Sequence, residues 1–185
     1  DVEAIARSLE SIARLEDPVG KEEVREPRGS FRLLRRRVPI GVILMIFESR
    51  PNVTAEAAAL CLKSGNACIL KGGSEAARTN AAIVASCPAE FVQLVTGRDE
   101  VAQLLRMEKQ IDLVIPRGGE SLIRAVASQT RIPVLKHDRG NCHVYVDEAA
   151  DLDMAFAIVK NAKCQRPATC NAVEHVLVHE AVARE

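Results

Sequence analysis

Two hydrophobic patterns alternate along this chain from Gly41 onward. Short runs of aliphatic residues, such as Val42–Phe47, are followed by longer stretches in which apolar residues recur every three or four positions. The runs are typical of buried strands and the stretches of amphipathic helices. Strands that are apolar throughout, each followed by a helix, build a parallel sheet with helices on both faces. We therefore predict an α/β fold with a doubly wound parallel sheet.

The same pattern gives expected positions for the elements. Strands are expected at 32–37, 42–47, 67–70, 91–95, 111–115, 133–135, 142–146 and 173–178. Helices are expected at 2–15, 54–63, 74–85 and 120–128 and also after Asp99 and Asp151, with Thr54, Ser74, Asp99 and Asp151 as N-caps. Residues 21–30 are charged and contain proline and glycine, so we expect a surface connection there.

Composition narrows the class of protein. The chain has 185 residues, 48% of them hydrophobic but only 3% aromatic, so its core must be aliphatic. It has 25 basic and 25 acidic side chains, and this balance gives no field that would attract nucleic acid or an anionic membrane. The longest apolar run is too short to span a bilayer. Six irregularly spaced cysteines predict reduced thiols rather than a disulfide scaffold, and hence an intracellular protein.

One stretch between the last expected helix and the last expected strand has an unusual composition. Asn161-Ala-Lys-Cys-Gln-Arg-Pro-Ala-Thr-Cys-Asn171 holds two thiols and a guanidinium, and Pro167 cannot continue the helix. Cys170 has polar neighbours, whereas a packed cysteine usually has aliphatic ones. Packing is the commoner role for an arbitrary cysteine, but loops between rigid elements often carry chemistry. Cys170 is thus a candidate that other segments must support.

Three expected strand ends carry polar sequences: Glu48-Ser-Arg-Pro-Asn52, Lys71-Gly-Gly-Ser-Glu75 and Pro116-Arg-Gly-Gly-Glu120. Each leads into a helix. Glycines let a ligand approach the backbone, and the helix start offers unpaired N–H groups to an anion. Neither glycine pair has the spacing of a known dinucleotide or P-loop fingerprint. Two such turns in one sheet nevertheless favour a dinucleotide with more than one phosphate.

Six motifs, in order along the chain, resemble the γ-glutamyl phosphate reductase family, a branch of the aldehyde dehydrogenase superfamily. They are Val38-Pro-Ile-Gly-Val-Ile, Phe47-Glu-Ser-Arg-Pro-Asn-Val-Thr, Ser64-Gly-Asn-Ala-Cys-Ile-Leu-Lys-Gly-Gly, Val114-Ile-Pro-Arg-Gly-Gly, Gly140-Asn-Cys-His-Val-Tyr-Val-Asp and the stretch 161–171. The resemblance implies a Rossmann-like fold of the aldehyde dehydrogenase type. It also implies an NADP-dependent oxidoreductase that reduces L-glutamyl 5-phosphate to L-glutamate 5-semialdehyde with NADPH, in proline biosynthesis.

The resemblance also implies a domain organisation. Residues 1–165 would form the NADP-binding α/β domain, in which residues 1–37 supply a helix and a strand before the core sheet. Residues 166–185 would form the nucleophile loop and the truncated start of a catalytic domain, most of which is absent from this chain. The connections at 21–30 and 86–90 are shorter than in the family.

Site residues follow from the same motifs. Cys170 matches the nucleophile, and Asn52 matches the side chain that stabilises the oxyanion together with the Cys170 backbone N–H. Lys71, Ser74 and Glu75 match the cofactor-ribose side, and Gly118 and Gly119 the loop facing the pyrophosphate. Arg50 and Arg166 are candidates for binding the phosphate or the carboxylates of the substrate. Where a hydrolytic relative keeps a glutamate base, this chain reads His137-Asp-Arg-Gly140, as suits a reductive enzyme.

For its surroundings, the resemblance implies a homo-oligomer in the cytoplasm, or in mitochondria for a eukaryotic bifunctional homologue. Functional coupling to a glutamate 5-kinase is a further expectation. Neither nucleic acid nor a membrane is expected as a partner.

Three alternatives stay open. An acyl-CoA-linked aldehyde dehydrogenase would share the thiol and the fold, and a dinucleotide-binding module without catalysis would share the glycine turns. A metal site from Cys164, Cys170, His175 and His179 is the third. It is disfavoured, because histidines four residues apart on a strand lie about 13 Å from each other. The two cysteines also fall outside the usual ligand spacing, so no metal is expected.

Overall fold

The computed structural model describes residues 2–28, 31–48, 50–137 and 140–184, and for residues 24–28, 31 and 32 it describes the backbone alone. The chain divides into two compact units, Asp1–His137 and Asp138–Glu185, which are described separately here. The boundary expected at residue 165 lies inside the second unit. That boundary separates the nucleophile loop from the cofactor domain by function, whereas the two units are defined by packing, so the functional boundary stays a prediction.

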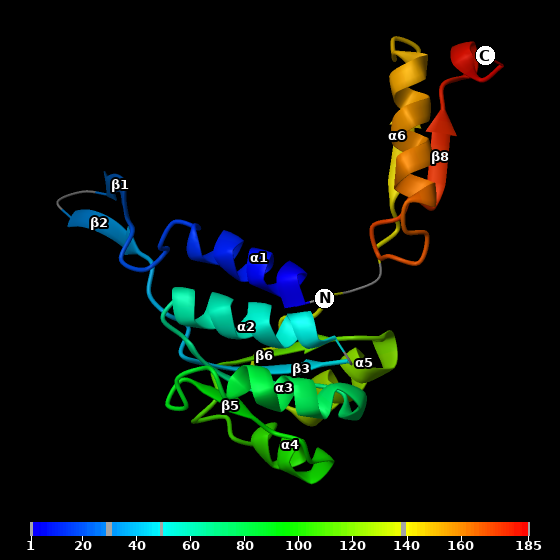
Figure 1. Ribbon diagram of the computed structural model, residues 1–185. Helices are drawn as coiled ribbons and strands as arrows, with labels where there is room; N and C mark the ends of the chain where they lie inside the picture. The colour runs from blue at the N-terminus through cyan, green and yellow to red at the C-terminus, as the bar shows by residue number, and fades with distance from the viewer. Residues whose placement is uncertain (1, 29–30, 49, 138–139, 185) are drawn as a thin grey trace. The chain divides into compact units, whose positions relative to one another are not determined.

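A four-stranded parallel sheet forms the centre of the first unit (Figure 1). Its order is β5-β4-β3-β6, with strands β3 (Val42–Phe47), β4 (Ala67–Lys71), β5 (Val92–Leu94) and β6 (Leu113–Arg117). Strands β4 and β5 are added on one side of β3, and β6 then pairs with its other side. The direction of winding therefore reverses between β3 and β6, and the predicted doubly wound parallel sheet is confirmed.

Alternate residues of β3 point to opposite faces of the sheet and enter two separate cores. Ile43 and Phe47 pack against α2 (Pro51–Lys63) through Ala57, Ala58 and Cys61. Leu44 and Ile46 belong to the other core, with Val126 of α5 (Glu120–Gln129) and Leu105 just after α4 (Arg98–Leu104). Each fully buried aliphatic side chain contributes about 1.5–3 kcal/mol by leaving water. Both faces are thus covered, as the apolar strands predicted.

Helix α1 (Val2–Ala13) lies against α2. Two long-range hydrogen bonds hold it there: Ser8 Oγ donates to Glu56 Oε1 (2.9 Å), and Lys63 Nζ donates to the Ala13 carbonyl (2.9 Å). These bonds attach an otherwise exposed helix to the core unit.

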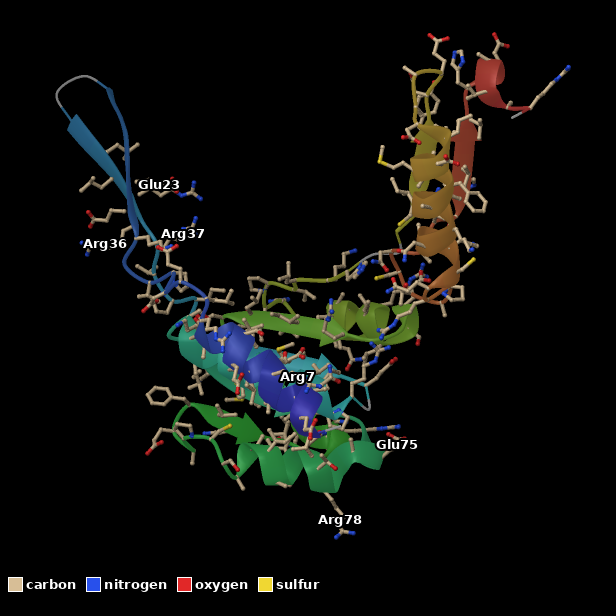
Figure 2. The ribbon with its side chains drawn as sticks, turned by 45° about the horizontal axis from the view of Figure 1, so that its top comes forward. Arg7, Glu23, Arg36, Arg37, Glu75 and Arg78 are labelled. Carbon is tan, nitrogen blue, oxygen red and sulfur yellow. The ribbon has the colours of Figure 1, made fainter. Side chains whose placement is uncertain are left out.

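A charged hairpin precedes the sheet. Strand β1 (Glu22–Arg28) pairs antiparallel with β2 (Phe31–Arg36), so the surface connection expected at 21–30 is wrong for most of that segment. Carboxylates on β1 form ion pairs with arginines at the end of β2 and just after it. Glu22 pairs with Arg36, and Glu23 pairs with Arg35 and Arg37. Glu23, Arg36 and Arg37 are labelled in Figure 2. These cross-strand ion pairs with β2 stabilise β1 as a strand, although its charged sequence alone does not predict one.

Helix starts differ from expectation at three places. Helix α2 begins at Pro51, a residue suited to the first helical position, and Thr54 is a fully buried residue in its second turn rather than the N-cap. Ser74 opens a short 3₁₀ turn, η1 (Ser74–Ala76), before α3 (Ala77–Val84). Gly97 caps α4 in place of Asp99, and Glu100 accepts the Gly97 N–H (3.1 Å).

Two further expectations concern a cap and a strand. Asp151 caps α6 (Leu152–Cys164) as expected, because its carboxylate accepts the Met154 N–H (3.0 Å). The strand expected at 133–135 is reduced to one bridge between Val134 and Val114.

The second unit is one β-α-β element. Strands β7 (His143–Val146) and β8 (His175–Val178) run parallel with α6 between them, and η2 (Glu180–Val182) follows. Phe156 of α6 is 68% exposed within the described residues. Among the helices described in either unit, none is both long and apolar enough to cross a membrane.

Candidate functional site

The carboxyl ends of β3 and β6 meet where the winding reverses, which is where ligands bind in sheets of this kind. Glu48, directly after β3, accepts a hydrogen bond from the Gly119 N–H at the start of α5 (2.8 Å). A Cβ atom added to Gly118 would lie 2.8 Å from Glu48 Oε1 and 2.8 Å from Leu122 Cδ2. The structure therefore brings the predicted pair Gly118 and Gly119 against Glu48, a residue whose role the sequence did not reveal.

The predicted ribose side follows β4. The Lys71 ammonium donates to the Gly72 carbonyl (2.8 Å) and so folds back over the glycine turn. Beside this turn lies a cavity of about 100 Å³, which includes the predicted residue Ser74. Its lining is Gly72, Gly73, Ser74, Ala77, Asn80, Leu94, Val95 and Thr96. Glu75 is exposed on η1 and lies outside that lining.

Asn80 and Thr96, the other polar residues of the cavity lining, belong to none of the motifs that point to a site. Asn80 looked like one more polar position of an amphipathic helix, yet it is 1% exposed. The one available signal was that a Gly-Gly turn often marks the close approach of another group.

Asn52 and Arg50 stand at the start of α2, and both are exposed. Arg50 is the N-cap residue, and its N–H donates to the Glu48 carbonyl (2.7 Å). Asn52 lies inside the first helical turn, next to a second cavity of about 330 Å³ that it shares with Ala4, Ile5, Pro51 and Glu56. Its position inside a helix argues against a role as a turn former.

In the second unit, Cys170 is exposed in the loop between α6 and β8. A compact turn holds this loop: the Thr169 N–H and hydroxyl both donate to the Arg166 carbonyl (3.1 and 2.8 Å). Cys142 Sγ donates to the Cys170 carbonyl (3.5 Å), and a Cβ atom on Gly140 would lie 2.8 Å from that same oxygen. The structure thus brings Arg166 and Cys170 into one turn, packed on the segment before β7.

All six cysteines are free, and their surroundings differ. Cys61 of α2 and Cys68 of β4 are both buried. The hydrogen bond with Cys61, together with burial, raises the pKa of Cys68. Burial also raises the pKa of Cys87. Cys164, the last residue of α6, is exposed like Cys170, so exposure alone does not choose between these two thiols.

A metal site would require several possible ligand side chains to lie close together. Across 2–28, 31–48, 50–137 and 140–184, no three His, Cys, Asp or Glu side chains gather in a way that could hold an ion. His175 instead stacks on His143, with ring centroids 4.8 Å apart. Asp138 and Arg139, in the segment where a hydrolytic base would stand, lie outside the described residues.

With this geometry established, comparison with known proteins identifies the class. The family described as "Aldehyde dehydrogenase family" matches residues 1–185, so the chain belongs to the aldehyde dehydrogenase family of oxidoreductases, which use nicotinamide dinucleotides.

Individual relatives point to a more specific group within this family. The γ-glutamyl phosphate reductase of Rhodopirellula baltica is 49% identical over all of this chain and 45% of its own length. That of Maridesulfovibrio salexigens is 50% identical over all of this chain and 47% of its own. The crystal structure of the Thermotoga maritima γ-glutamyl phosphate reductase superposes with a TM-score of 0.88 at 43% identity, covering all of this chain and 47% of that one.

These findings confirm the resemblance and the fold predicted from sequence. The chain spans about half the length of the curated relatives it matches.

Proposed function

We propose that this chain is part of an enzyme that reduces L-glutamyl 5-phosphate to L-glutamate 5-semialdehyde and phosphate with NADPH, through a cysteine thioester, in proline biosynthesis. The observation that carries the proposal is the exposed Cys170 thiol in the ordered turn before β8. The relatives named as γ-glutamyl phosphate reductases, half identical to this chain, support the choice of substrate.

The first chemical step belongs to Cys170. Its thiolate attacks the acyl carbon of the substrate, a carbon–sulfur bond forms, and phosphate leaves with the electrons of the broken carbon–oxygen bond. The oxyanion of the tetrahedral intermediate accepts from the Cys170 N–H and the Asn52 amide in this proposal. Donors of this kind contribute about 2.7–4 kcal/mol each. The thioester that remains is ready for reduction.

Bound NADPH would supply the hydride that reduces the thioester to the aldehyde. The residues proposed to hold the cofactor are Lys71, Ser74, Glu75, Gly118 and Gly119. One feature of the first unit supports this role: the cavity beside the Gly72 turn. At Gly118, Glu48 and Leu122 already pack so closely that a side chain would collide with them. Because the Gly119 N–H already donates to Glu48, the glycine pair would serve the pyrophosphate by close approach rather than through that N–H.

Arg50 and Arg166 are proposed to bind the phosphate or the carboxylates of the substrate. Both are exposed; Arg50 lies two residues before Asn52, and Arg166 lies four residues before Cys170. A homo-oligomer, the cytoplasm as compartment, and coupling to a kinase that makes the acyl phosphate remain parts of the proposal.

One assay separates this function from its alternatives. The full-length protein is given L-glutamate 5-semialdehyde and NADP⁺, and NADPH formation is followed by absorbance. The proposal expects formation that depends on added inorganic phosphate, because phosphate must cleave the thioester in this direction. Dependence on coenzyme A instead would identify the acyl-CoA-linked enzyme, and NADPH binding without turnover would identify a non-catalytic module.

A further inference from the structure

The cavity beside the Gly72 turn contains a polar side chain that the proposed function has not used. It lies between the carboxyl ends of β4 and β5 and the start of α3, and Asn80 of α3 lines it. Asn80 is 1% exposed, and it approaches the turn so closely that a Cβ atom on Gly72 would lie 2.3 Å from its Nδ2 atom. The glycine at position 72 is therefore needed to leave room for this amide.

The orientation of the Asn80 amide is fixed from the other side. Thr54, fully buried in α2, donates its hydroxyl to Asn80 Oδ1 (2.9 Å). An asparagine held by its oxygen presents its NH₂ group at the opposite corner of the amide. The Nδ2 atom accordingly faces Gly72 and the cavity.

The NH₂ group of Asn80 can donate a hydrogen bond into the cavity. Within the described chain, the hydroxyl of Thr54 is the hydrogen-bond partner of the Asn80 side chain, and it engages the oxygen. Among the same residues, no fully enclosed side-chain nitrogen or oxygen lacks a partner. The amide nitrogen must therefore reach the cavity surface, where a ligand or water accepts from it, since a buried donor left unpaired is destabilising.

The groups around the cavity select an anionic oxygen as that acceptor. The Lys71 ammonium lies on the Gly72 carbonyl at the edge of the lining, and the lining itself holds Ser74 and Thr96. The cavity of about 100 Å³ has room for a group of the size of a phosphate.

We propose that Asn80 binds the 2′-phosphate of NADPH through its Nδ2 atom and is a specificity residue for this cofactor. The inference rests on the proposed function for the presence of a nicotinamide dinucleotide. It adds that the selection of NADPH over NADH depends on a buried neutral amide, held by Thr54, as well as on the lysine at the end of β4.

The test is Asn80→Asp in the full-length protein, with NADPH and NADH affinities measured by fluorescence titration. The variant keeps the oxygen that accepts from Thr54 but replaces the donor with a second oxygen that repels phosphate. NADPH binding should weaken at least tenfold, since hydrogen bonds to charged groups are among the stronger ones, while NADH binding changes less than threefold. Equal weakening for both cofactors, or none for either, would overturn the inference.

Two companion variants complete the test. Thr79→Asp places the same charge at the neighbouring, exposed position of α3 and should leave both affinities within twofold of wild type. Thr54→Val leaves Asn80 in place but frees its amide to rotate, so it should weaken NADPH binding severalfold with little change for NADH. If Asn80→Asp does not fold, Thr54→Val decides: an unchanged preference for NADPH contradicts the inference. Wild-type protein that binds neither cofactor would refute the proposed function itself.

Discussion

The carboxylate of Glu48 accepts a hydrogen bond from the Gly119 N–H at 2.8 Å, across the point where the winding of the sheet reverses. The N–H groups at a helix start have no partner within the helix, and the helix dipole favours a negative charge beside them. Glu48, although distant in sequence, thus supplies both an acceptor and a charge to α5. A side chain of the protein itself occupies the position at which an anionic ligand would otherwise be expected.

Substitutions at the two neighbouring glycines should therefore have unequal effects. In Gly118→Ala the new Cβ would collide with Glu48 Oε1, whereas in Gly119→Ala the nearest such atom is the same oxygen at an ordinary 3.6 Å. We expect Gly118→Ala to push Glu48 off the helix start and lower the free energy of unfolding by about 1 kcal/mol. Gly119→Ala should cost less than about 0.5 kcal/mol. Urea denaturation of the full-length variants measures both.

The control for this prediction is a double-mutant cycle. In a Glu48→Ala background the carboxylate that the new Cβ would displace is absent. Gly118→Ala should therefore lower the free energy of unfolding by less than it does in the wild-type protein. Fully additive costs would show that Glu48 and Gly118 act independently.

The sequence predicted the sheet well because burial on both faces leaves a strong signal. Val42–Phe47 is apolar at every position, and the structure places its alternate side chains in two different cores. Asp151 is likewise recognisable, since an acceptor just before a periodic stretch is what a helix start requires.

Other features depend on partners that are remote in sequence. Strand β1 is charged and contains a proline, and its pairing with β2 is stabilised by carboxylates that meet arginines across the hairpin. Thr54 has the residue type of an N-cap, but its hydroxyl serves Asn80, 26 positions away. The roles of Glu48 and Asn80 at the site could not be predicted for the same reason. Their contacts join segments distant in sequence, and no local sequence pattern indicates them.

Lys71 is expected to discriminate between the two nicotinamide cofactors. Its ammonium, held at the Gly72 carbonyl, would meet the 2′-phosphate that only NADPH carries. Lys71→Ala should weaken NADPH binding about tenfold and NADH binding much less, as measured by fluorescence titration. Lys63→Ala is the matched control, because it removes one ammonium whose bond is to the Ala13 carbonyl on α1. The same loss for both cofactors in Lys71→Ala would remove this role.

Asn52 is expected to act on the rate rather than on the fold. It is exposed in the first turn of α2, so Asn52→Ala should change the free energy of unfolding by no more than about 0.5 kcal/mol. As an oxyanion donor it should lower kcat by about 10²–10³-fold when removed, with NADPH affinity nearly unchanged. Asn52→Asp, which is isosteric but lacks the NH₂ donor, should lose at least as much. A normal kcat together with a lowered melting temperature would mean that Asn52 is structural.

The last prediction concerns which of six cysteines is the nucleophile. Cys170 and Cys164 are both exposed, but Cys164 is the last residue of α6, whereas Cys170 lies in the loop beyond the helix, where the resemblance places the nucleophile. Cys170→Ser should therefore abolish phosphate-dependent turnover, and Cys164→Ser should retain most of it. A thiol-directed acylating reagent should modify Cys170 first in the native protein, as read by mass spectrometry.

The buried cysteines provide the internal control for that labelling. Cys61 is enclosed in the core, and Cys68 combines 1% exposure with a raised pKa, so both should react only after unfolding. Early labelling of either would mean that the native fold had opened during the reaction. If Cys170→Ser kept substantial activity while Cys164→Ser lost it, the nucleophile would be Cys164 and the thioester would form at the end of α6 instead.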